Sequence, residues 1–480
     1  MKWVNSPTKF LGIFASYDEK GNNQMNFNLK VQKLQTNLDM WNSRGLTLYG
    51  KVLIIKSLGL SNLIYSISNT NVPKEIVSTV KDKMFRFLWK NKKDKIKRTS
   101  LYQDFSNGGL RMVDIELTIR SLRLAWIQRL IFGNKGNWKN VPDHFFKKHG
   151  GLNFLLQCNY DTKYLGHFPE FYRDILIAFD EIKTLYNYDQ GNDIILFNNK
   201  DILVDGKPIF IREWFNKGIH TIQELLNENG QYLTFQDFQI KYHCKTNFLQ
   251  FYQILSAIPG FLKEKARTLG QNPMLNYSEN YTSFLLNQNT EINLEKFKAR
   301  DYYHLLLAKK HQSLPTGPKR WGTDLSMDTE DWKEIFSANP KLCKENKLKE
   351  FQFKFIHRIV VTKKELFKYG IHADSDCTYC SEPDSIDHTF INCTFTRTFA
   401  RNVIDWFNVQ NGSSFQPDTK EMLFSSCKYP NNPVLERKVN YTLLFMKYYI
   451  YASKLNNNLL CLTDFSNKLN LKYKVENLKQ

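Results

Sequence analysis

Several features that define common protein classes are scarce or absent in this chain of 480 residues. Its eight Cys are too few for a disulfide scaffold, which favours a reducing compartment. No uncharged apolar run approaches the roughly 20 residues that a bilayer-spanning helix needs. The opening residues, MKWVNSPTKFLGIF, lack the apolar core and cleavage site of a signal peptide. We therefore expect an intracellular protein of the cytoplasm or nucleus, with no membrane partner.

Familiar catalytic motifs are missing as well. No Asp-Asp dipeptide offers the paired metal-binding carboxylates of polymerases, and neither G-x-S-x-G nor H-E-x-x-H occurs. The run from Gly45 to Lys51 matches most of a phosphate-binding loop, but Val52 stands where a hydroxyl would bind Mg²⁺. We interpret Gly45 as a helix stop and Lys51 as a cation on the next helix. His357 could act as a base, but its Phe-rich helix favours a packed histidine. We predict no catalytic residue.

Against these absences stands one cluster of metal-ligand residues, in the segment CTYCSEPDSIDHTFINC. Cys377, Cys380, His388 and Cys393 offer three thiols and one imidazole at short spacing, enough to close a tetrahedral shell around Zn²⁺. Thiolate ligands favour zinc over Mg²⁺ or Ca²⁺. A shell closed by four protein ligands is structural and not catalytic. A chance grouping of Cys and His is the alternative.

Positive charge is the second strong feature, with a formal net charge of +20. Residues 1–130 hold 22 Lys and Arg against 9 Asp and Glu, a surplus of 13. Residues 81–98 hold nine basic and two acidic side chains, interleaved with Phe85, Phe87 and Trp89. Helical spacing favours these aromatic side chains as core residues. The cations still favour a polyanion, with nucleic acid first and an acidic membrane surface second.

Periodicity predicts a mainly helical fold with one or two short hairpins. We expect helices with apolar positions from Leu29 to Trp41, and then over 47–68, 74–90 and 111–132. A strand-like run covers 10–14, and a hairpin is expected from residues 193–199 and 200–210. Residues 106–109 read as a loop, and a Pro/Gly linker near 315 precedes a helical block around the cysteines.

Long stretches of the sequence resemble the reverse transcriptase of LINE-type (non-LTR) retrotransposons, beginning just after its catalytic palm. The resemblance is carried by KFLGIF at 9–14, by residues 26–73, which include the specific run from Trp41 to Tyr65, and by residues 85–130. It continues through REWFNKGIHTIQELLNENGQYLTFQDFQIKY, LSAIPG, and EFQFKFIHRIVVTKKELFKYGIHADSDCTYC. These segments span nearly the whole chain.

The resemblance implies a domain layout and a set of contacts. Residues 1–24 would be a remnant of the palm-edge primer-grip hairpin, 25–130 a helical thumb, 131–315 a connecting helical region and 320–480 a C-terminal domain with the zinc site. The thumb would contact template RNA or an RNA–DNA duplex. The candidate contacts, carried over by position, are Arg44, Lys51, Lys56, Lys92, Lys93, Lys95, Lys97 and Arg98.

Departures from the family pattern shape the functional expectation. The family's YxDD box, the other palm aspartate and the endonuclease would lie upstream of the residues present here. We therefore expect a nucleic-acid-binding fragment that cannot polymerise alone, because two-metal phosphoryl transfer needs those carboxylates. One alternative is an active polymerase whose palm, with Mg²⁺, comes from another chain. The other is a non-catalytic zinc-dependent module for protein interaction.

Overall fold

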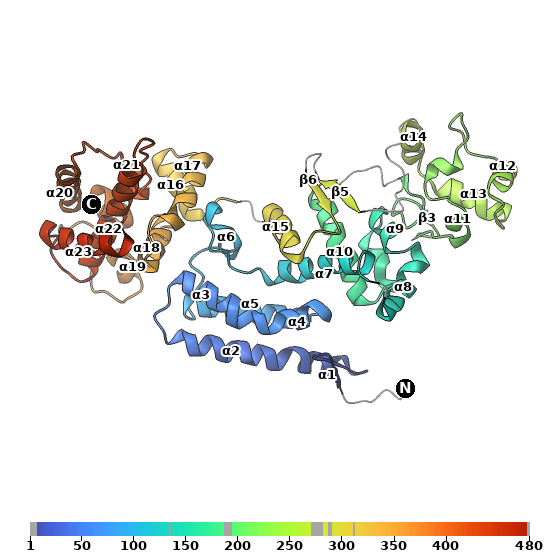
Figure 1. The fold of residues 1–480 in the computed structure, drawn as a ribbon, viewed down its shortest axis with the longest axis horizontal. Helices are drawn as coiled ribbons and strands as arrows, with labels where there is room; N and C mark the ends of the chain where they lie inside the picture. The colour runs from blue at the N-terminus through green and yellow to red at the C-terminus, as the bar shows by residue number, and fades with distance from the viewer. Residues whose placement is uncertain are drawn as a thin grey trace. The chain divides into compact units, whose positions relative to one another are not determined.

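The computed structural model describes residues 7–134, 136–186, 194–269, 282–286, 290–310 and 313–477. Within these residues the protein is mostly helical, with short two-stranded antiparallel sheets (Figure 1), which confirms the predicted fold class. The chain divides into two compact units, and each takes three separate segments. Unit 1 contains Met1–Glu19, Ile64–Val77 and Ile115–Lys310, and unit 2 contains Lys20–Leu63, Ser78–Asp114 and His311–Gln480.

Three helices form the centre of unit 1: α7 (Ile115–Ile131) packs against both α10 (Glu170–Leu185) and α15 (Ala299–Lys310). Arg123 of α7 is buried, and its guanidinium donates to the Ile67 carbonyl at 2.8 Å. Further helical elements among the described residues of the unit are η4 (Asn137–Lys139), α8 (Asn140–Phe146), η5 (Lys147–His149), α9 (Leu152–Gln157), η6 (Thr162–His167), α11 (Arg212–Asn216), η8 (Ile222–Leu225), α12 (Phe235–Tyr242), α13 (Phe248–Ala257) and α14 (Gly260–Leu269).

Unit 1 contains one hairpin at the run predicted as strand-like and another near the predicted hairpin. The run 10–14 is split, because β1 (Thr8–Phe10) pairs with β2 (Ile13–Ala15) and Leu11 and Gly12 form the turn between them. The second hairpin lies wholly inside 200–210: β3 (Leu203–Val204) pairs with β4 (Lys207–Pro208) around Asp205-Gly206, where both φ angles are positive, as a two-residue turn requires. The prediction of a strand over 193–199 was wrong, since residues 194–197 are buried and only Ile195 forms a bridge. Asp193 lies outside the described residues.

A third pair, β5 (Ser283–Leu286) with β6 (Thr290–Asn293), was not predicted. The four-residue strands flank a segment without a distinctive two-residue turn signal, so the sequence pattern did not reveal them.

The first two segments of unit 2 follow the predicted helices closely. They contain α1 (Glu19–Asn23), the π-helical η1 (Gln24–Asn28), α2 (Leu29–Asn42), α3 (Leu48–Ile54), the π-helical η2 (Ile55–Leu60), α6 (Arg98–Tyr102) and η3 (Phe105–Asn107), with parts of α4 (Ser61–Asn69) and α5 (Lys74–Trp89). Thr47 caps α3 by accepting from the Gly50 amide at 3.2 Å. Phe85, Phe87 and Trp89 are buried, which confirms the core interpretation of these aromatic residues.

One continuous helical stretch, Leu48–Asn69, is long and apolar enough to cross a membrane by length and composition. Half of its most apolar part is buried inside the protein, and the stretch carries Lys51 and Lys56. Leu34 and Leu38 of α2 pack near Gly59 within it. The burial is that of a core helix.

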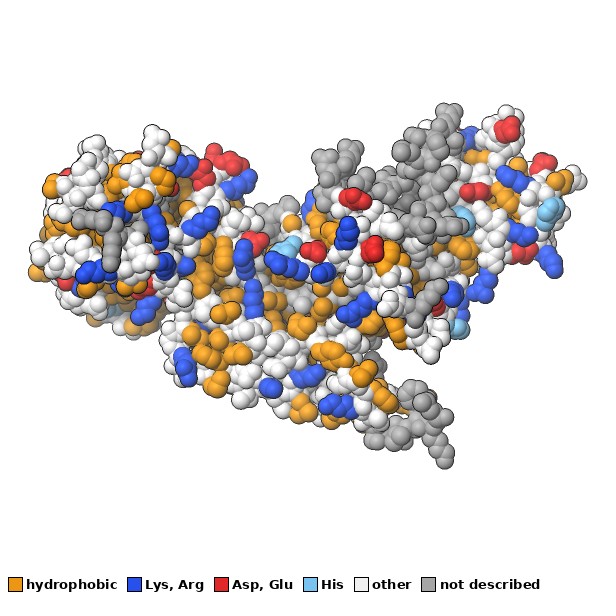
Figure 2. Space-filling view, in the orientation of Figure 1, with side chains coloured by type: hydrophobic (Ala, Val, Ile, Leu, Met, Phe, Trp, Pro, Cys, Tyr) orange, Lys and Arg blue, Asp and Glu red, His pale blue; other side chains and the backbone are white. Residues whose placement is uncertain are grey.

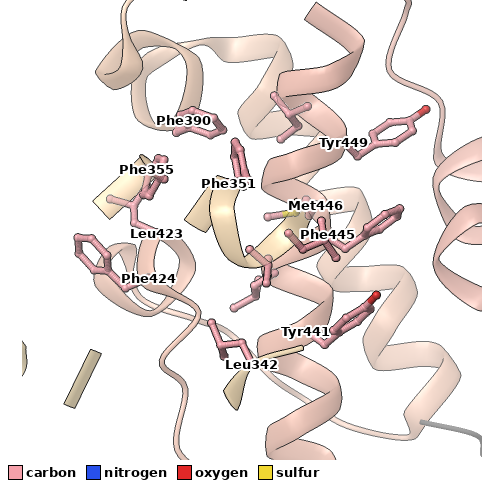
Figure 3. Packing of buried hydrophobic residues seen from close by; sticks show 14 of the residues in the cluster. Leu342, Phe351, Phe355, Phe390, Leu423, Phe424, Tyr441, Phe445, Met446 and Tyr449 are labelled. Atoms are coloured by element: carbon pink, nitrogen blue, oxygen red, sulfur yellow. The ribbon is translucent and has the colours of Figure 1, made fainter. Parts of the chain in front are cut away.

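The third segment of unit 2 forms a helical domain around α22 (Pro433–Leu455). Figure 3 shows Phe351, Phe355 and Phe390 beside this helix, together with its own Phe445 and Met446. Phe390 lies 5.0 Å from Phe355, ring centre to ring centre, in an edge-to-face arrangement. The surrounding elements are α16 (Thr316–Leu325), α17 (Thr329–Ala338), η10 (Asn339–Lys341), α18 (Asn346–Ile356), α19 (Lys363–Lys368), η11 (His388–Asn392), α20 (Thr394–Asn411), α21 (Thr419–Phe424) and α23 (Leu462–Glu476).

The loop over residues 106–109 is packed tightly inside unit 2. A Cβ on Gly108, whose φ is +76°, would lie 2.7 Å from the ring of Phe336. A Cβ on Gly109 would lie 1.9 Å from the Gln103 carbonyl oxygen. The Gly108 carbonyl also pairs with Nε2 of the buried His357 at 2.8 Å. Gly108 therefore allows the loop to approach Phe336 closely, and Gly109 allows it to fold back on the backbone of Gln103.

Candidate zinc centre

The four predicted metal ligands come from two short turns that the fold closes against each other. The first turn is held by an antiparallel bridge between Asp376 and Pro383, and the Cys377 amide donates to the Glu382 carbonyl at 2.8 Å. The second is the π-helical η11, which begins at His388 and has Cys393 as its C-cap. Cys393 is also the N-cap of α20.

The ligand atoms of these residues converge on one point. The Sγ of Cys377 and the Nε2 of His388 lie with the other two sulfurs in a group whose atoms are all within 4.8 Å of one another. The Sγ of Cys393 is 4.0 Å from that of Cys377 and 3.9 Å from that of Cys380, whose sulfur is 3.2 Å from the imidazole. Zn–S bonds of about 2.3 Å in a tetrahedron place sulfurs ~3.8 Å apart. The geometry and the donor set therefore fit zinc.

Burial affects the pKa of Cys377, Cys380 and His388, and Lys454 contributes at Cys377 and His388. Burial opposes ionisation of Cys377, but the Tyr379 amide and then Lys454 outweigh it and lower the pKa of the thiol. Burial, followed by the nearby Cys377, raises the pKa of Cys380 to about 11. Burial and then Lys454 lower the pKa of His388, which keeps the imidazole in the neutral form that binds metals. Zinc binding would therefore release a proton from Cys380.

A buried ion pair between Lys454 and Asp384 supports the first turn. Lys454 of α22 and Asp384 are 4% and 5% exposed, and their ammonium and carboxylate groups are paired. Thr389 of η11 donates its hydroxyl to Asp384 at 2.7 Å, and the Lys363 amide donates to the same carboxylate at 3.1 Å. Thr378, between two of the ligands, donates to the Lys454 carbonyl at 3.5 Å. One lysine thus connects the metal-binding turns to the longest helix of the domain.

Arg358 holds in place the residue that precedes the second turn. Its guanidinium pairs with Asp324 at 2.7 Å and with Asp387, the residue before His388, at 2.5 Å. It also lies over the ring of the buried Trp321, 4.0 Å from the ring centre. The side chain is only 8% exposed. This buried cation orients η11 and is not available to a ligand in solvent.

The site is that of a structural zinc module, since three Cys and one His close the shell and leave no open position for substrate. A family model described as zinc-binding in reverse transcriptase matches residues 297–399, which include all four ligands. The match covers a minority of the chain. It supports a relation to reverse transcriptases through this segment, which includes the last stretch of the resemblance.

Most of the predicted nucleic-acid contacts lie on the surface of unit 2. The exposed members are Arg44, Lys56, Lys92, Lys93, Lys95 and Lys97. Arg44 stacks on Trp41, 4.9 Å from the ring centre. Arg98 is half-buried and already paired with Asp94 at 2.7 Å. Basic side chains outnumber acidic ones on the face that Figure 2 shows.

Lys51 differs from the other predicted contacts because it is 2% exposed. Its ammonium donates to the carbonyl oxygens of Phe87 and Leu88, at 2.8 and 3.0 Å, near the C-terminal end of α5. The last carbonyls of a helix lack partners within the helix, so Lys51 caps α5. Burial, and then Lys90, lower the pKa of Lys51 to about 8. The structure gives this lysine a packing role and no path to a phosphate in solvent.

Lys354, which was not among the predicted contacts, lies near the predicted cations. Burial is the first cause of the lowered pKa of Lys95, and the charges of Lys354 and Lys92 are the next. Lys354 belongs to α18, inside the segment matched by the family model. Its nearest acidic partner is Glu350, at 3.1 Å. The position in FQFKF was visible in the sequence, but only the fold places it beside residues 90–95.

His357, considered above as a base, is a packed residue. It is 5% exposed, and burial lowers its pKa to about 4. Cys343 and Cys427, outside the metal cluster, are buried free thiols.

Proposed function

We propose that this chain is the nucleic-acid-binding part of a LINE-type reverse transcriptase, and that it holds template RNA or an RNA–DNA duplex without carrying the catalytic palm. In this proposal zinc is structural, and Mg²⁺ enters only with a palm supplied by another chain. The zinc module keeps the C-terminal helices folded. The thumb-like helices, with the loop between α5 and α6, contact the sugar–phosphate backbone.

The observation that carries the proposal is a cluster of cations in unit 2, defined by Lys90, Lys92, Lys95 and Lys354. These ammonium groups come from two segments far apart in the sequence, and after burial their charges are the next cause that lowers the pKa of Lys51 and Lys95. Among the residues that the structure describes, Lys354 is the one member of the four that forms an ion pair, with Glu350. Such a cluster is relieved by a polyanion, because phosphates neutralise the repelling charges and release counterions.

The test measures binding of a labelled single-stranded RNA and an RNA–DNA duplex to the full chain at 50 and 200 mM salt by fluorescence anisotropy. Affinity should fall steeply over this range. In a triple variant, Lys92→Ala, Lys95→Ala and Lys354→Ala, the salt slope should fall by about 2 to 3, as expected for three lost phosphate contacts. The control triple replaces the exposed Lys319, Lys341 and Lys428 with Ala and carries the same change in net charge.

Equal effects of the two triple variants would show that only net charge matters and would reject the cluster as a binding site. Binding that does not weaken with salt would show that electrostatic contacts with phosphates do not drive it. A chain that holds zinc and ignores both nucleic acids would instead favour the zinc-dependent module for protein interaction.

Exposed apolar residues in η2 and α3 favour a second candidate, an active polymerase whose palm lies in another chain. Leu53 is 63% exposed and Leu58 is 37% exposed, whereas Leu60 is buried. A thumb that packs on a palm would cover such residues. Primer extension by the chain with Mg²⁺ and nucleotides, with and without a separately expressed palm, tests this candidate. No incorporation in either reaction would exclude it.

A further inference from the structure

A hollow of about 200 Å³ is lined by residues of η11, α20, α21 and α22. Most of its wall is apolar. Three lining side chains, Phe390, Leu423 and Met446, belong to the core shown in Figure 3, and Ile404 and Ile450 also line the wall. Pockets for drug-sized molecules measure roughly 300–1,000 Å³. This hollow therefore suits one small organic group.

Every charged side chain that lines the hollow is basic: Arg397 and Arg401 of α20, and Lys447 of α22. Both arginines are exposed, so they stand at the mouth of the hollow. Among the residues that the structure describes, neither arginine forms an ion pair, not even with Asp405, one turn beyond Arg401. Like charges four residues apart on a helix repel each other. An anion at the mouth would remove this repulsion, and the lining supplies none.

Lys447 adds a buried positive charge to the lining. The residue is 2% exposed, and its ammonium donates to Oε1 of Gln352 at 2.9 Å and to the Leu423 carbonyl. It also lies 5.0 Å from the ring centre of Phe355. No carboxylate pairs with it in the described part of the chain, and burial holds the pKa of Lys447 well below its usual value. A buried charge without a counter-ion is costly, and an anion nearby lowers that cost.

Hydrogen bonds beside the zinc centre hold the wall of the hollow in place. Thr396 lines the hollow, and its hydroxyl donates to the Thr389 carbonyl at 2.9 Å and to the Cys393 carbonyl at 3.2 Å. Thr389 also lines the hollow, and its own hydroxyl donates to Asp384. The turn of α20 that carries Arg397 is therefore attached to η11 and to a metal ligand. The hollow is preformed, as sites for small ligands usually are.

We propose that this hollow binds the 5′-phosphate of a nucleotide, with the phosphate paired to Arg397 and Arg401 and the base against the apolar wall. A phosphate monoester carries about −1.5 to −2 charges and three acceptor oxygens, so it can pair with two guanidinium groups at once. A carboxylate has one charge and two oxygens. A free nucleotide and the 5′-phosphorylated end of an RNA present the same group. These contacts are separate from Lys92, Lys95 and Lys354, so the inference does not depend on the proposed function.

The apolar wall favours a nucleotide over a phosphorylated peptide. A phosphoserine joins its phosphate to a peptide backbone, whose N–H and C=O groups would lose water against side chains such as Ile404 and Ile450 without gaining partners. A nucleobase covers apolar side chains with its flat face and keeps its polar edge toward the mouth. An internal phosphodiester fits less well, because it carries a single charge and continues as a chain on both sides.

The test measures binding of AMP, adenosine and inorganic phosphate to the full zinc-loaded chain by isothermal titration calorimetry. AMP should bind at least about tenfold more tightly than either part, because only AMP uses both the arginines and the apolar wall. The double variant Arg397→Gln/Arg401→Gln should weaken AMP binding about tenfold, since it removes both charge-assisted contacts. The control, Arg300→Gln/Arg320→Gln, removes two exposed arginines that do not line the hollow, with the same change in net charge. AMP affinity should not change in the control, and both variants should keep their zinc.

A second measurement separates the two sources of the phosphate. It compares an RNA of about 12 nucleotides that carries a 5′-phosphate with the same RNA that ends in a 5′-hydroxyl. A preference of about tenfold for the phosphorylated end, lost in Arg397→Gln/Arg401→Gln, would identify an RNA end as the occupant. AMP binding without this preference would identify a free nucleotide.

Three results would overturn the inference. AMP that does not bind, or binds no more tightly than inorganic phosphate, would show that the apolar wall contributes nothing. Equal losses in the two double variants would show that only net charge matters. A phosphoserine peptide that displaces AMP at equal concentration would assign the hollow to a protein partner. None of these results concerns the salt-dependent binding through Lys92, Lys95 and Lys354, so the proposed function is tested separately.

Discussion

Replacement of Lys454 with Met should weaken the zinc module although Lys454 is not a metal ligand. The change keeps the length of the side chain and removes its charge. It leaves the Asp384 carboxylate, 5% exposed, with only the Thr389 hydroxyl and the Lys363 amide as partners. Breaking a buried ion pair from one side costs about 3 to 5 kcal/mol. Because Asp384 and Thr389 position both metal-binding turns, we also expect zinc affinity to fall about 10–100-fold.

Competition for zinc with a chromogenic chelator measures the affinity, and chemical unfolding followed by circular dichroism measures stability. The double variant Lys454→Met/Asp384→Asn removes both charges, so it should recover at least half of the loss. Lys468→Met serves as the control, because Lys468 pairs with Asp464 on the surface and is 56% exposed. Such a surface pair contributes at most about 1 kcal/mol.

Two outcomes would refute this reasoning. If Lys454→Met retained zinc within twofold of the unchanged chain, the buried pair would not position the ligands. If the single substitutions were additive in the double variant, Lys454 and Asp384 would not be coupled, and the loss would have to come from packing alone.

Two further predictions concern buried basic residues in unit 2. The pKa of His357 is lowered to about 4, against about 6.5 in an unfolded chain. As pH falls, the unfolded state therefore binds a proton before the folded state does. The free energy of unfolding should fall by up to about 3 kcal/mol between about pH 6.5 and pH 4. In His357→Gln this loss should disappear from the pH dependence of unfolding. Identical pH profiles for the variant and the unchanged chain would contradict the prediction. Lys51→Met leaves two α5 carbonyls without their partner and should cost about 1–3 kcal/mol in unfolding experiments. The salt slope of RNA binding should not change in this variant, whereas a reduced slope would show that Lys51 contacts phosphate.

Local patterns predicted the helices and the metal ligands well, because both depend on short-range spacing. Apolar periodicity located α2 and α5, and the distances among the ligands of the zinc centre follow from turns within residues 376–393. The resemblance to reverse transcriptases is supported over residues 297–399.

Features that depend on distant segments were not predictable from one sequence. Lys51 and Lys92 look alike in a charge count, and only tertiary packing buries the first and exposes the second. Lys454 gave no signal in YASKL, because its partner Asp384 lies far back along the chain. Lys354 joined the cation cluster for the same reason. The strand predicted over 193–199 failed because an apolar run can be buried without entering a sheet.

The order of segments in unit 2 has a consequence for synthesis of the chain. Its first two segments, within residues 20–114, pack with residues that begin at 311, after nearly all of unit 1. At typical translation rates the gap lasts roughly 10 to 40 seconds. During that time the Gly108 carbonyl has no His357 to bind, and the apolar faces that later meet α17 and α18 are open to water. Nascent chains should therefore recruit chaperones until the last third leaves the ribosome, and a fragment ending before residue 311 should aggregate.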